Sequence, residues 1–281
     1  MSVLVTGGAG RLGYEVSRLL QGDGFRVRAF DLPGVPWGHV EALGVETFKG
    51  DITDPIGVRD ALKGVSAVVH LAALLPPRSE ASHEATTRVN VGGTGNLLKA
   101  MAPGAHMVLA SSISTYGVTA REVPPIREDH PQAAHNYYSE SKIAAERLAL
   151  DSGRPAAALR IAPIAVAELL ELPKVVEYRA DQRVEFVYVE DAARAIASCV
   201  RDGAAGVYNV AGGASWRTTG AEYISRFYGA LGAEVEPVFS EKYTAVDWYD
   251  TGRSQRLGYQ RTSFQAFEER LRAVGESYGL R

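Results

Sequence analysis

The sequence has a single cysteine, Cys199, among its 281 residues, so no disulfide can form within the chain. Cys199 stands in a helix-like segment beside the apolar residues Ile196, Ala197 and Val200. Cysteine is among the residue types most often buried, and we therefore expect Cys199 to fill the core rather than to act as a nucleophile. A chain that needs no disulfide fits a reducing compartment, and we expect it in the cytoplasm.

The chain also lacks a strong excess of either charge and any long apolar run. Its 30 Lys and Arg residues nearly balance 33 Asp and Glu residues, for a formal net charge of -3. This charge creates no basic field that would attract nucleic acid or an anionic membrane surface. Charged residues or prolines interrupt the apolar stretches, and the chain starts on a strand-like segment without a basic leader. We therefore expect no transmembrane helix, no signal peptide, and neither a nucleic-acid nor a membrane partner.

What is present near the start of the chain is a glycine-rich segment between a strand-like run, 3–5, and a helix-like run, 11–20. Strand, glycine turn and helix N-terminus in this order can hold the pyrophosphate of a dinucleotide. The first glycine would permit the tight turn, the second the approach of the pyrophosphate, and the third the packing of the helix on the strand. A plain glycine-rich connection is the alternative. The residues predicted to form the dinucleotide site are Gly7, Gly10, Arg11, Leu12 and Gly13.

The next strand-like segment, 26–30, is followed directly by Asp31, about 18 residues beyond Gly13 and close to the spacing typical of this motif. An acidic side chain here would accept hydrogen bonds from the adenosine ribose and would repel a 2′-phosphate. We therefore predict NAD as the cofactor. Arg11 and Arg28 keep NADP as the less favoured alternative, because either guanidinium could reach a 2′-phosphate.

Strand-like and helix-like segments continue to alternate as far as Ile161, which predicts a parallel sheet with helices on both faces. We predict an α/β fold, a Rossmann-type doubly wound parallel sheet with a small C-terminal substrate lobe. Residues 1–161 would form the NAD-binding domain, a segment at about 185–211 would rejoin it, and the remainder of 162–281 would form the lobe. The further strands are expected at 45–49, 67–71, 107–110, 156–161, 185–189 and 207–210, and the further helices at 56–62, 82–101, 137–150, 190–200, 219–231 and 262–278.

Tyr138 and Lys142 lie four residues apart in the helix-like segment 137–150, so both side chains would project from one face of that helix. A phenol ionises near pH 10 in water, and a neighbouring ammonium together with a cationic nicotinamide ring would lower its pKa. Tyr138 could then accept the proton of a substrate hydroxyl while a hydride leaves the same carbon. An exposed helical pair without a chemical role is the alternative.

Serine residues follow the strand-like segment 107–110, at the strand end where parallel-sheet enzymes place reactive groups. We predict that Ser112 hydrogen-bonds the reacting oxygen. Ser111 and Ser114 are expected mainly to cap the loop, and Ser114 is in addition a candidate substrate contact.

With these residues assembled, the chain resembles the extended, epimerase-like branch of the short-chain dehydrogenase/reductase family over nearly its whole length. The resemblance implies an NAD-dependent enzyme with Ser112, Tyr138 and Lys142 as catalytic residues. The motifs that carry it are TGGAGRLG at 6–13, GDITD at 50–54, HLAA at 70–73, SSISTYG at 111–117, YSESK at 138–142 and FVYVEDAA at 186–193. Residues at the cofactor, by the same resemblance, are Asp51 and Ile52 at the adenine, Leu71, Ala72 and Ala73 at the nicotinamide ribose, Asn90, which is equally well explained as a buried helix residue, and Ile161.

Departures from the family's motifs narrow the expected chemistry. Ile113 and Ser114 stand where dehydratases of this branch carry an Asp-Glu pair, which disfavours dehydration. Residues 162–164 replace the asparagine that helps epimerases to hold a nucleotide diphosphate, and Glu168, Glu171 and Glu177 would repel a diphosphate if they faced the cleft. Arg217 and Arg253 are predicted to bind an anionic group of the substrate.

We therefore predict an NAD-dependent oxidoreductase that transfers a hydride at a carbinol or carbonyl carbon of a sugar, sugar acid or similar small polyhydroxylated compound. A nucleotide-sugar epimerase with tightly bound NAD is one alternative, and a non-catalytic NAD(P)-sensing regulator is another. The histidines show no spacing typical of a metal site. By resemblance we expect a homodimer formed through the helices that contain residues 90–101 and 137–150.

Overall fold

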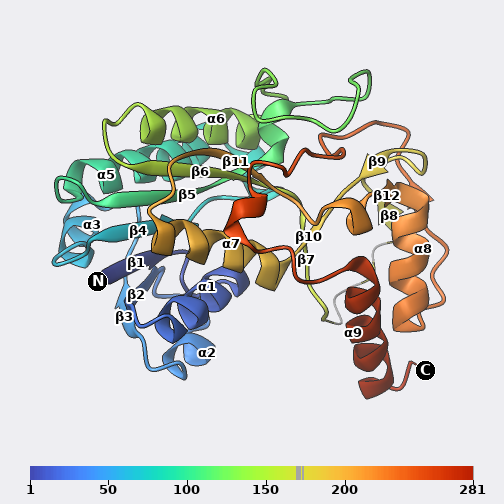
Figure 1. Cartoon of the computed structure of the whole chain (residues 1–281), viewed down its shortest axis with the longest axis horizontal. Helices are drawn as coiled ribbons and strands as arrows, with labels where there is room; N and C mark the ends of the chain where they lie inside the picture. Colours follow the sequence, from blue (N-terminus) through green and yellow to red (C-terminus); the bar gives the residue numbers. More distant parts are fainter. Residues whose placement is uncertain (169–171, 173, 281) are drawn as a thin grey trace.

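Seven parallel strands form the central sheet, in the order β11-β6-β5-β4-β1-β2-β3 (Figure 1). The computed structural model describes residues 1–168, 172 and 174–280. Glu171, one of the glutamates expected to repel a diphosphate, lies outside the described residues. The strands of this sheet are β1 Ser2–Thr6, β2 Arg26–Asp31, β3 Glu46–Lys49, β4 Ala67–His70, β5 His106–Ser112, β6 Ala156–Ile161 and β11 Gly206–Val210.

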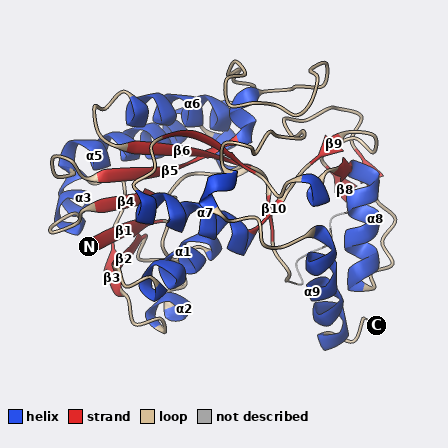
Figure 2. Cartoon of the chain, in the orientation of Figure 1, coloured by secondary structure: helices blue, strands red, loops and turns tan. Residues whose placement is uncertain are grey.

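Helices cover both faces of the sheet, as Figure 2 shows. Both faces of the sheet are apolar because the strands contain consecutive apolar residues, and successive residues of a strand point to opposite sides. Thus Val3 and Val5 join the core cluster beneath α1 and α7, whereas Leu4 joins the cluster beneath α3, α5 and α6. The helices are α1 Arg11–Gly22, α2 Gly38–Glu41, α3 Pro55–Ala61, α4 His83–Thr86, α5 Gly93–Ala100, α6 Tyr137–Leu150, α7 Val189–Asp202, α8 Gly220–Leu231 and α9 Phe264–Ser277, with a π-helical turn at Thr87–Gly92.

The remaining strands are short and lie in a smaller lobe beyond the carboxyl ends of the sheet strands (Figure 1). Helices α8 and α9 pack together there around an aromatic core that includes Trp216, Phe264 and Phe267. These strands pair only in twos, β7 Ile164–Ala165 with β10 Val187–Tyr188, β9 Arg183–Val184 with β12 Thr218–Thr219, and β8 Val175–Val176 with β13 Val238–Phe239.

The segment 185–189, expected as one strand, differs from that expectation. Residues 183–184 pair antiparallel with β12, whereas residues 187–188 pair parallel with β7, and α7 begins at Val189. The chain changes partner at Glu185, whose carboxylate accepts hydrogen bonds from the backbone amides of Gly213 and Tyr249. Two half-strands therefore replace the continuous one, and only β11 of this region joins the main sheet.

Cys199 is fully buried in α7, and burial raises the pKa of its thiol to about 12. A thiol that stays protonated is a poor nucleophile, in keeping with a packing role. Among the described helices, none has the length and apolar composition needed to cross a membrane.

Candidate active site

The turn between β1 and α1 needs glycine at several of its positions, of which Gly7 and Gly13 border the cavity. Gly7 has a φ of +69°, and a Cβ on it would lie 2.9 Å from the backbone nitrogen of Ala72. A Cβ on Gly13 would lie 2.2 Å from the carbonyl oxygen of Gly7. Gly10 is different, because its added Cβ would meet only that carbonyl, at 3.4 Å. Gly7 and Gly13 are therefore fixed by the fold, whereas Gly10 keeps the surface of the turn open.

Helix α1 begins immediately after this turn and receives no side-chain cap from Gly10. The residues at its start, Arg11, Leu12 and Gly13, line the same cavity as Gly7 and Gly10. An uncapped helix N-terminus with glycine before it is a favourable place for a phosphate group.

The acidic residues expected at the adenosine lie at the carboxyl ends of β2 and β3. Asp31 accepts hydrogen bonds from the amides of Ala9, at 3.1 Å, and Leu32, at 2.8 Å. Asp51 accepts from the amide and the hydroxyl of Thr53, both at 2.8 Å. The two carboxylates therefore shape the loops beside the glycine turn, and Ile52 packs between them and α5 with its side chain against Gly93.

The end of β4 is fixed to its neighbours through His70. Its Nδ1 is 2.8 Å from the Thr6 hydroxyl, and its Nε2 is 3.0 Å from the Thr94 hydroxyl. Burial lowers the pKa of His70 to about 3, with a further contribution from the charge of Lys142. A neutral His70 thus joins β1, β4 and α5, and Leu71, the next residue, lines the cavity.

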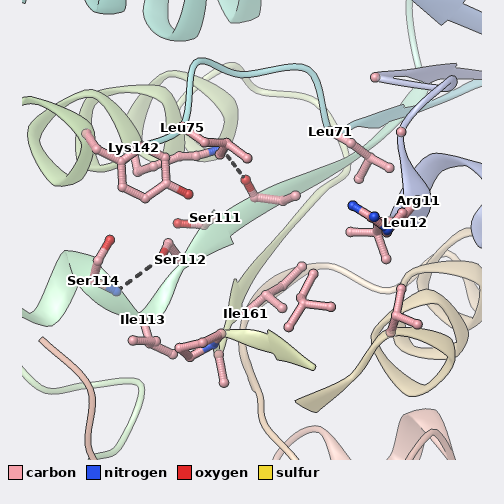
Figure 3. A pocket seen from close by; sticks show the side chains of 18 of the residues that line it. Arg11, Leu12, Leu71, Leu75, Ser111, Ser112, Ile113, Ser114, Lys142 and Ile161 are labelled. Atoms are coloured by element: carbon pink, nitrogen blue, oxygen red, sulfur yellow. Dashed lines mark hydrogen bonds between the residues drawn. The ribbon is translucent and has the colours of Figure 1, made fainter. Parts of the chain in front are cut away.

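A cavity of about 630 Å³ joins the glycine turn to the carboxyl ends of β5 and β6. Figure 3 shows Arg11 and Leu12 on one side of it, with Lys142, Ser112 and Ser114 on the other. Tyr138 and Ile161 also line the cavity. The structure therefore brings the predicted catalytic residues and the glycine turn to one continuous space.

The three predicted catalytic residues, Ser112, Tyr138 and Lys142, lie close together. Ser112 shares a hydrogen bond with the Tyr138 phenol, and its Oγ also accepts from the amide of Ser114 at 3.1 Å. The Lys142 Nζ lies 5.6 Å from the centre of the Tyr138 ring and donates to the carbonyl of Ala110 at 2.8 Å (Figure 3). One hydroxyl, one phenol and one buried amine therefore meet at the end of β5.

The acidity of Tyr138 differs from what the Tyr-Lys spacing alone predicts. Burial raises the pKa of the Tyr138 phenol to about 12, and only the hydrogen bond with Ser112 acts in the opposite direction. Burial also lowers the pKa of Lys142 to about 8. The protein alone therefore keeps the phenol protonated, since the loss of hydration outweighs the hydrogen bond with Ser112.

Ser111, the neighbour of Ser112, is engaged elsewhere. Its hydroxyl donates to the Glu146 carboxylate at 2.7 Å, and Glu146 is also paired with Arg160 at 2.5 Å in a buried ion pair. Ser111 also lines the cavity, but its hydroxyl is bonded to this network under α6, whereas the Ser112 hydroxyl is bonded to Tyr138. Glu146 is a residue that the motifs alone did not single out.

The start of α6 determines where Tyr138 stands. Asn136 and Ser139 form a reciprocal capping box, and Glu80 accepts hydrogen bonds from the amides of Tyr137 and Tyr138 at 3.0 and 3.1 Å. The sequence pattern Asn-x-x-Ser before a helix could have revealed the cap. Glu80 reaches this helix from a distant segment, Arg78–Ala81, and no local signal marks it.

One wall of the cavity is formed by residues of the loop 244–249, which we call the roof loop. The Gln182 amide donates to the carbonyls of Thr244 and Val246 at 3.1 and 3.0 Å. Arg183 pairs with Asp247 at 2.6 Å, and Glu185 accepts from the amide of Tyr249 at 2.9 Å. These bonds hold the two cavity-lining residues of the roof loop, which are Ala245 and Val246.

Asn90, Arg217 and Arg253 are among the predicted site residues that lie away from the cavity lining. The side-chain NH2 of Asn90 donates to the Leu74 carbonyl and to the Ser141 hydroxyl, and its side-chain oxygen accepts from the Leu74 amide. Asn90 therefore connects the loop after β4 to α6. Arg217 pairs with the buried Glu185 at 3.2 Å, and the Arg253 guanidinium lies 5.7 Å from the centre of the Tyr208 ring. Their roles in binding remain predictions, as does that of Ala73. In the described part of the chain no group of three His, Cys, Asp or Glu residues could hold a metal ion.

Comparison with known proteins agrees with this geometry. The family model for the NAD dependent epimerase/dehydratase family matches residues 3–162, which include the glycine turn, Ser112, Tyr138 and Lys142. The chain belongs to this family. The match covers more than half of the chain and ends just after β6.

Members of the epimerase/dehydratase family with different activities resemble the chain to similar degrees. D-erythronate dehydrogenase of Cupriavidus necator is 32% identical over 55% of this chain and 51% of its own. UDP-glucose 4-epimerase of Lactobacillus helveticus is 36% identical over 53% and 46%, and a Mycobacterium tuberculosis 3 beta-hydroxysteroid dehydrogenase/isomerase is 32% identical over 53% and 42%. The chain thus spans about half the length of these curated relatives.

The likeness in structure extends further than the likeness in sequence. The crystal structure of UDP-glucose 4-epimerase from Thermus thermophilus, a complex with NAD, superimposes with a TM-score of 0.84 at 25% identity and covers 98% of this chain and 99% of that one. The lobe beyond β6 therefore belongs to the shared fold even though its sequence has diverged.

Proposed function

We propose that the protein is an NAD-dependent oxidoreductase that exchanges a hydride at the carbinol or carbonyl carbon of a small molecule. The observation that carries this proposal is the single cavity in which Tyr138, Ser112 and Lys142 face the glycine turn of β1 and α1. The NAD-bound structure of the Thermus thermophilus relative supports the choice of cofactor.

The residues of the cavity fit a dinucleotide. Gly10 leaves the turn open, α1 presents uncapped amides to a pyrophosphate, and Asp31 stands at the end of β2 where a ribose hydroxyl would meet a carboxylate. When bound, oxidised NAD supplies the hydride acceptor and places a positive charge in the cavity. The carboxylate of Asp31 disfavours the additional phosphate of NADP by charge repulsion.

We assign proton transfer to the phenol of Tyr138. Its phenol oxygen accepts the proton of the substrate hydroxyl in the oxidation direction and returns it to the carbonyl oxygen in the reverse direction. The Ser112 hydroxyl, already hydrogen-bonded to this phenol, stabilises the phenolate before substrate binds and can then donate its one proton to the reacting oxygen instead. Lys142 keeps most of its charge at neutral pH because its lowered pKa is still about 8, and so it favours the phenolate.

The test is a comparison of wild-type protein with Tyr138→Phe. We expect the variant to lose at least about a hundredfold in NADH formation, the usual contribution of an acid-base group, while it binds NAD as tightly as the wild type. A Tyr138→Phe protein that forms NADH at the wild-type rate would contradict the role of Tyr138. Failure of the wild type to bind NAD would contradict the whole proposal.

An epimerase that returns the hydride to the opposite face of the same carbon is the second candidate. The whole-length likeness to the Thermus thermophilus epimerase favours it. An epimerase produces no net NADH, whereas a dehydrogenase accumulates it in proportion to product. Product analysis beside NADH absorbance therefore separates the two.

We further propose a cytoplasmic homodimer formed through α5 and α6. The exposed apolar side chains Tyr137 and Leu148 on α6, 42% and 40% exposed, support a partner on this surface. Analytical ultracentrifugation of wild type and Leu148→Glu tests the dimer, because a buried charge would weaken it.

A further inference from the structure

Two large apolar side chains that line the cavity are exposed to solvent. Leu75 is 54% exposed and Ile164 is 39% exposed, and both line the cavity. Exposed apolar side chains that gather around one concave space are typical of a site for an apolar ligand. Figure 3 places Leu75 on the same side of the cavity as Lys142 and Ser112, away from Arg11 and Leu12. The exposed apolar side chain of Leu75 therefore adjoins the reacting groups.

This apolar wall is rigidly supported. Ile113 is buried directly after Ser112, and Ala245 and Val246 face the cavity from the roof loop. The bonds from Gln182, Arg183 and Glu185 to the roof loop fix the backbone on both sides of these residues. A wall that is already in place needs little ordering when a ligand binds.

Charged groups are scarce in the cavity. Of its described lining residues, Arg11 and Lys142 alone are charged, and both have partners in the structure. Arg11 pairs with Glu168 at 2.8 Å at the glycine-turn end, and Lys142 is bonded to the Ala110 carbonyl. The arginines expected to bind an anionic substrate, Arg217 and Arg253, lie outside the lining. A carboxylate or a diphosphate would thus lose its hydration without gaining a side-chain cation that lacks a partner.

One further polar atom is available in addition to Ser112 and Tyr138. The Ser114 hydroxyl is buried at the cavity and has no hydrogen-bond partner among the described residues. Buried hydroxyls are normally bonded, so this oxygen is suited to a ligand group. It lies beside Ser112 (Figure 3), so a substrate oxygen near the reacting carbon can reach it.

We propose that the substrate is an uncharged secondary alcohol, or the corresponding ketone, whose carbinol carbon belongs to a largely apolar ring or chain, with Ser114 as an additional specificity-determining contact. This rests on the oxidoreductase function proposed above and is an alternative to the sugar or sugar acid expected from the sequence. In the oxidation the carbinol C–H bond breaks and its hydride passes to NAD, which is reduced to NADH. The O–H proton goes to Tyr138 and then to solvent, and the C–O bond becomes a carbonyl.

Three ring alcohols of matched shape test the substrate class. Cyclohexanol carries one hydroxyl, myo-inositol carries a hydroxyl on every ring carbon, and 4-hydroxycyclohexanecarboxylate adds a negative charge. With NAD present, we expect cyclohexanol to give the highest kcat/KM of the three, and alkyl substituents to raise it about fourfold per methylene. A higher kcat/KM for the polyol or the carboxylate overturns the inference, and if Tyr138→Phe abolishes that turnover the proposed function still stands.

Substitutions in the wall test the site itself. Ile164→Ser and Leu75→Ser should each raise KM for cyclohexanol about tenfold and leave kcat and NAD binding nearly unchanged. Ile56→Ser is the matched control, because Ile56 is 61% exposed but does not line the cavity. Ser114→Ala should lower kcat/KM for alcohols with a second oxygen next to the carbinol carbon, but not for cyclohexanol. An unchanged KM in both wall variants contradicts the proposal.

Binding without turnover separates the two proposals. Calorimetric titration of the NADH-loaded protein with decalol should give a negative heat-capacity change, the mark of apolar burial. Decalol that binds in this titration but is not oxidised when NAD replaces NADH would leave the apolar site intact and contradict the oxidoreductase function. Absence of decalol binding to a protein that does bind NADH would overturn the apolar site.

Discussion

The Tyr138 phenol shows how burial and charge compete at a single residue. Its pKa is raised to about 12 in the protein without cofactor, although Ser112 donates to it. A positive charge added to the cavity should lower this pKa, because it favours the phenolate. We therefore predict that tyrosinate absorbance attributable to Tyr138 appears only at strongly alkaline pH in the free protein and at lower pH with oxidised NAD bound.

The measurement is the difference between wild type and Tyr138→Phe in an absorbance titration with pH. This subtraction is needed because burial also raises the pKa values of Tyr116 and Tyr259 to about 12. An identical titration of Tyr138 with and without NAD would show that the bound cofactor does not stand near the phenol.

The glycine turn offers a second test at the residue scale. In Gly13→Ala the new methyl would lie 2.2 Å from the Gly7 carbonyl, whereas in Gly10→Ala it would lie 3.4 Å from the same atom. Gly13→Ala should therefore lower the free energy of unfolding by about 2 kcal/mol or more, as overpacking does, since backbone must move. Gly10→Ala should unfold like the wild type but bind NAD more weakly. Urea denaturation and NAD titration measure the two effects, and equal stability of the two variants would contradict the steric argument.

At this scale local patterns in the sequence indicate the candidate reactive residues, whose roles stay predictions, but they do not indicate the supporting contacts of these residues. The spacing of Tyr138 and Lys142 and the strand end at Ser112 are local features, and the structure brings all three together. Glu80 and Glu185 act through contacts with residues distant in the sequence, such as Tyr138 and Tyr249, which no local pattern encodes. The raised pKa of Tyr138 likewise depends on burial, which the Tyr-Lys spacing does not report.

At the scale of elements, helix α6 and strand β6 have the predicted bounds, because each has a strong periodic pattern and a clear start. The segment 185–189 does not form the predicted strand, because it changes pairing partner between β12 and β7. Its apolar pattern is the same whether it pairs with one partner or with two. The roof loop has no regular element at all, yet side chains from residues 182–185 hold it firmly in place.

The carboxyl group of Glu185 should make the stability of the protein depend on pH. Burial raises the pKa of this carboxyl to about 7, against the opposing effects of Arg217 and the amides of Gly213 and Tyr249. Because the folded state holds this proton more tightly than the unfolded state, the free energy of unfolding should fall as pH rises from the ordinary carboxyl range to about 7. We predict a loss of up to about 3 kcal/mol across this interval in wild type, and its disappearance in Glu185→Gln.

Urea denaturation at a series of pH values measures this change, with Glu234→Gln as a control because Glu234 is exposed in the lobe. A wild-type slope that persists in Glu185→Gln would assign the pH dependence to other groups. The KM for substrate is an additional readout. If ionisation of Glu185 displaces the roof loop, substrate binding should weaken before NAD binding does.

For the whole molecule, the strand order explains why residues distant in sequence share one cavity. The sheet reverses its direction of progression beside β1, and the carboxyl ends of β1, β4, β5 and β6 therefore open on the same side, where the lobe covers them (Figure 1). The alternation of segments predicts this arrangement as far as β6. The lobe is less predictable, because its strands are two residues long and it is held together mainly by aromatic packing around Trp216 and Phe267.

A ligand that binds the folded chain in this cleft should stabilise the whole molecule. Saturation at about a hundred times Kd adds about 2.7 kcal/mol to the free energy of unfolding, which for a chain of this size corresponds to a rise in Tm of about 5 °C or more. At equal concentration we predict a larger rise with NAD than with NADP, because Asp31 repels the 2′-phosphate. Asp31→Asn should narrow the difference by removing the charge, and Asp23→Asn, a change at an exposed carboxylate that follows α1, should not. A larger rise with NADP in the wild type would show that Arg11 or Arg28 outweighs Asp31 and would reverse the cofactor assignment.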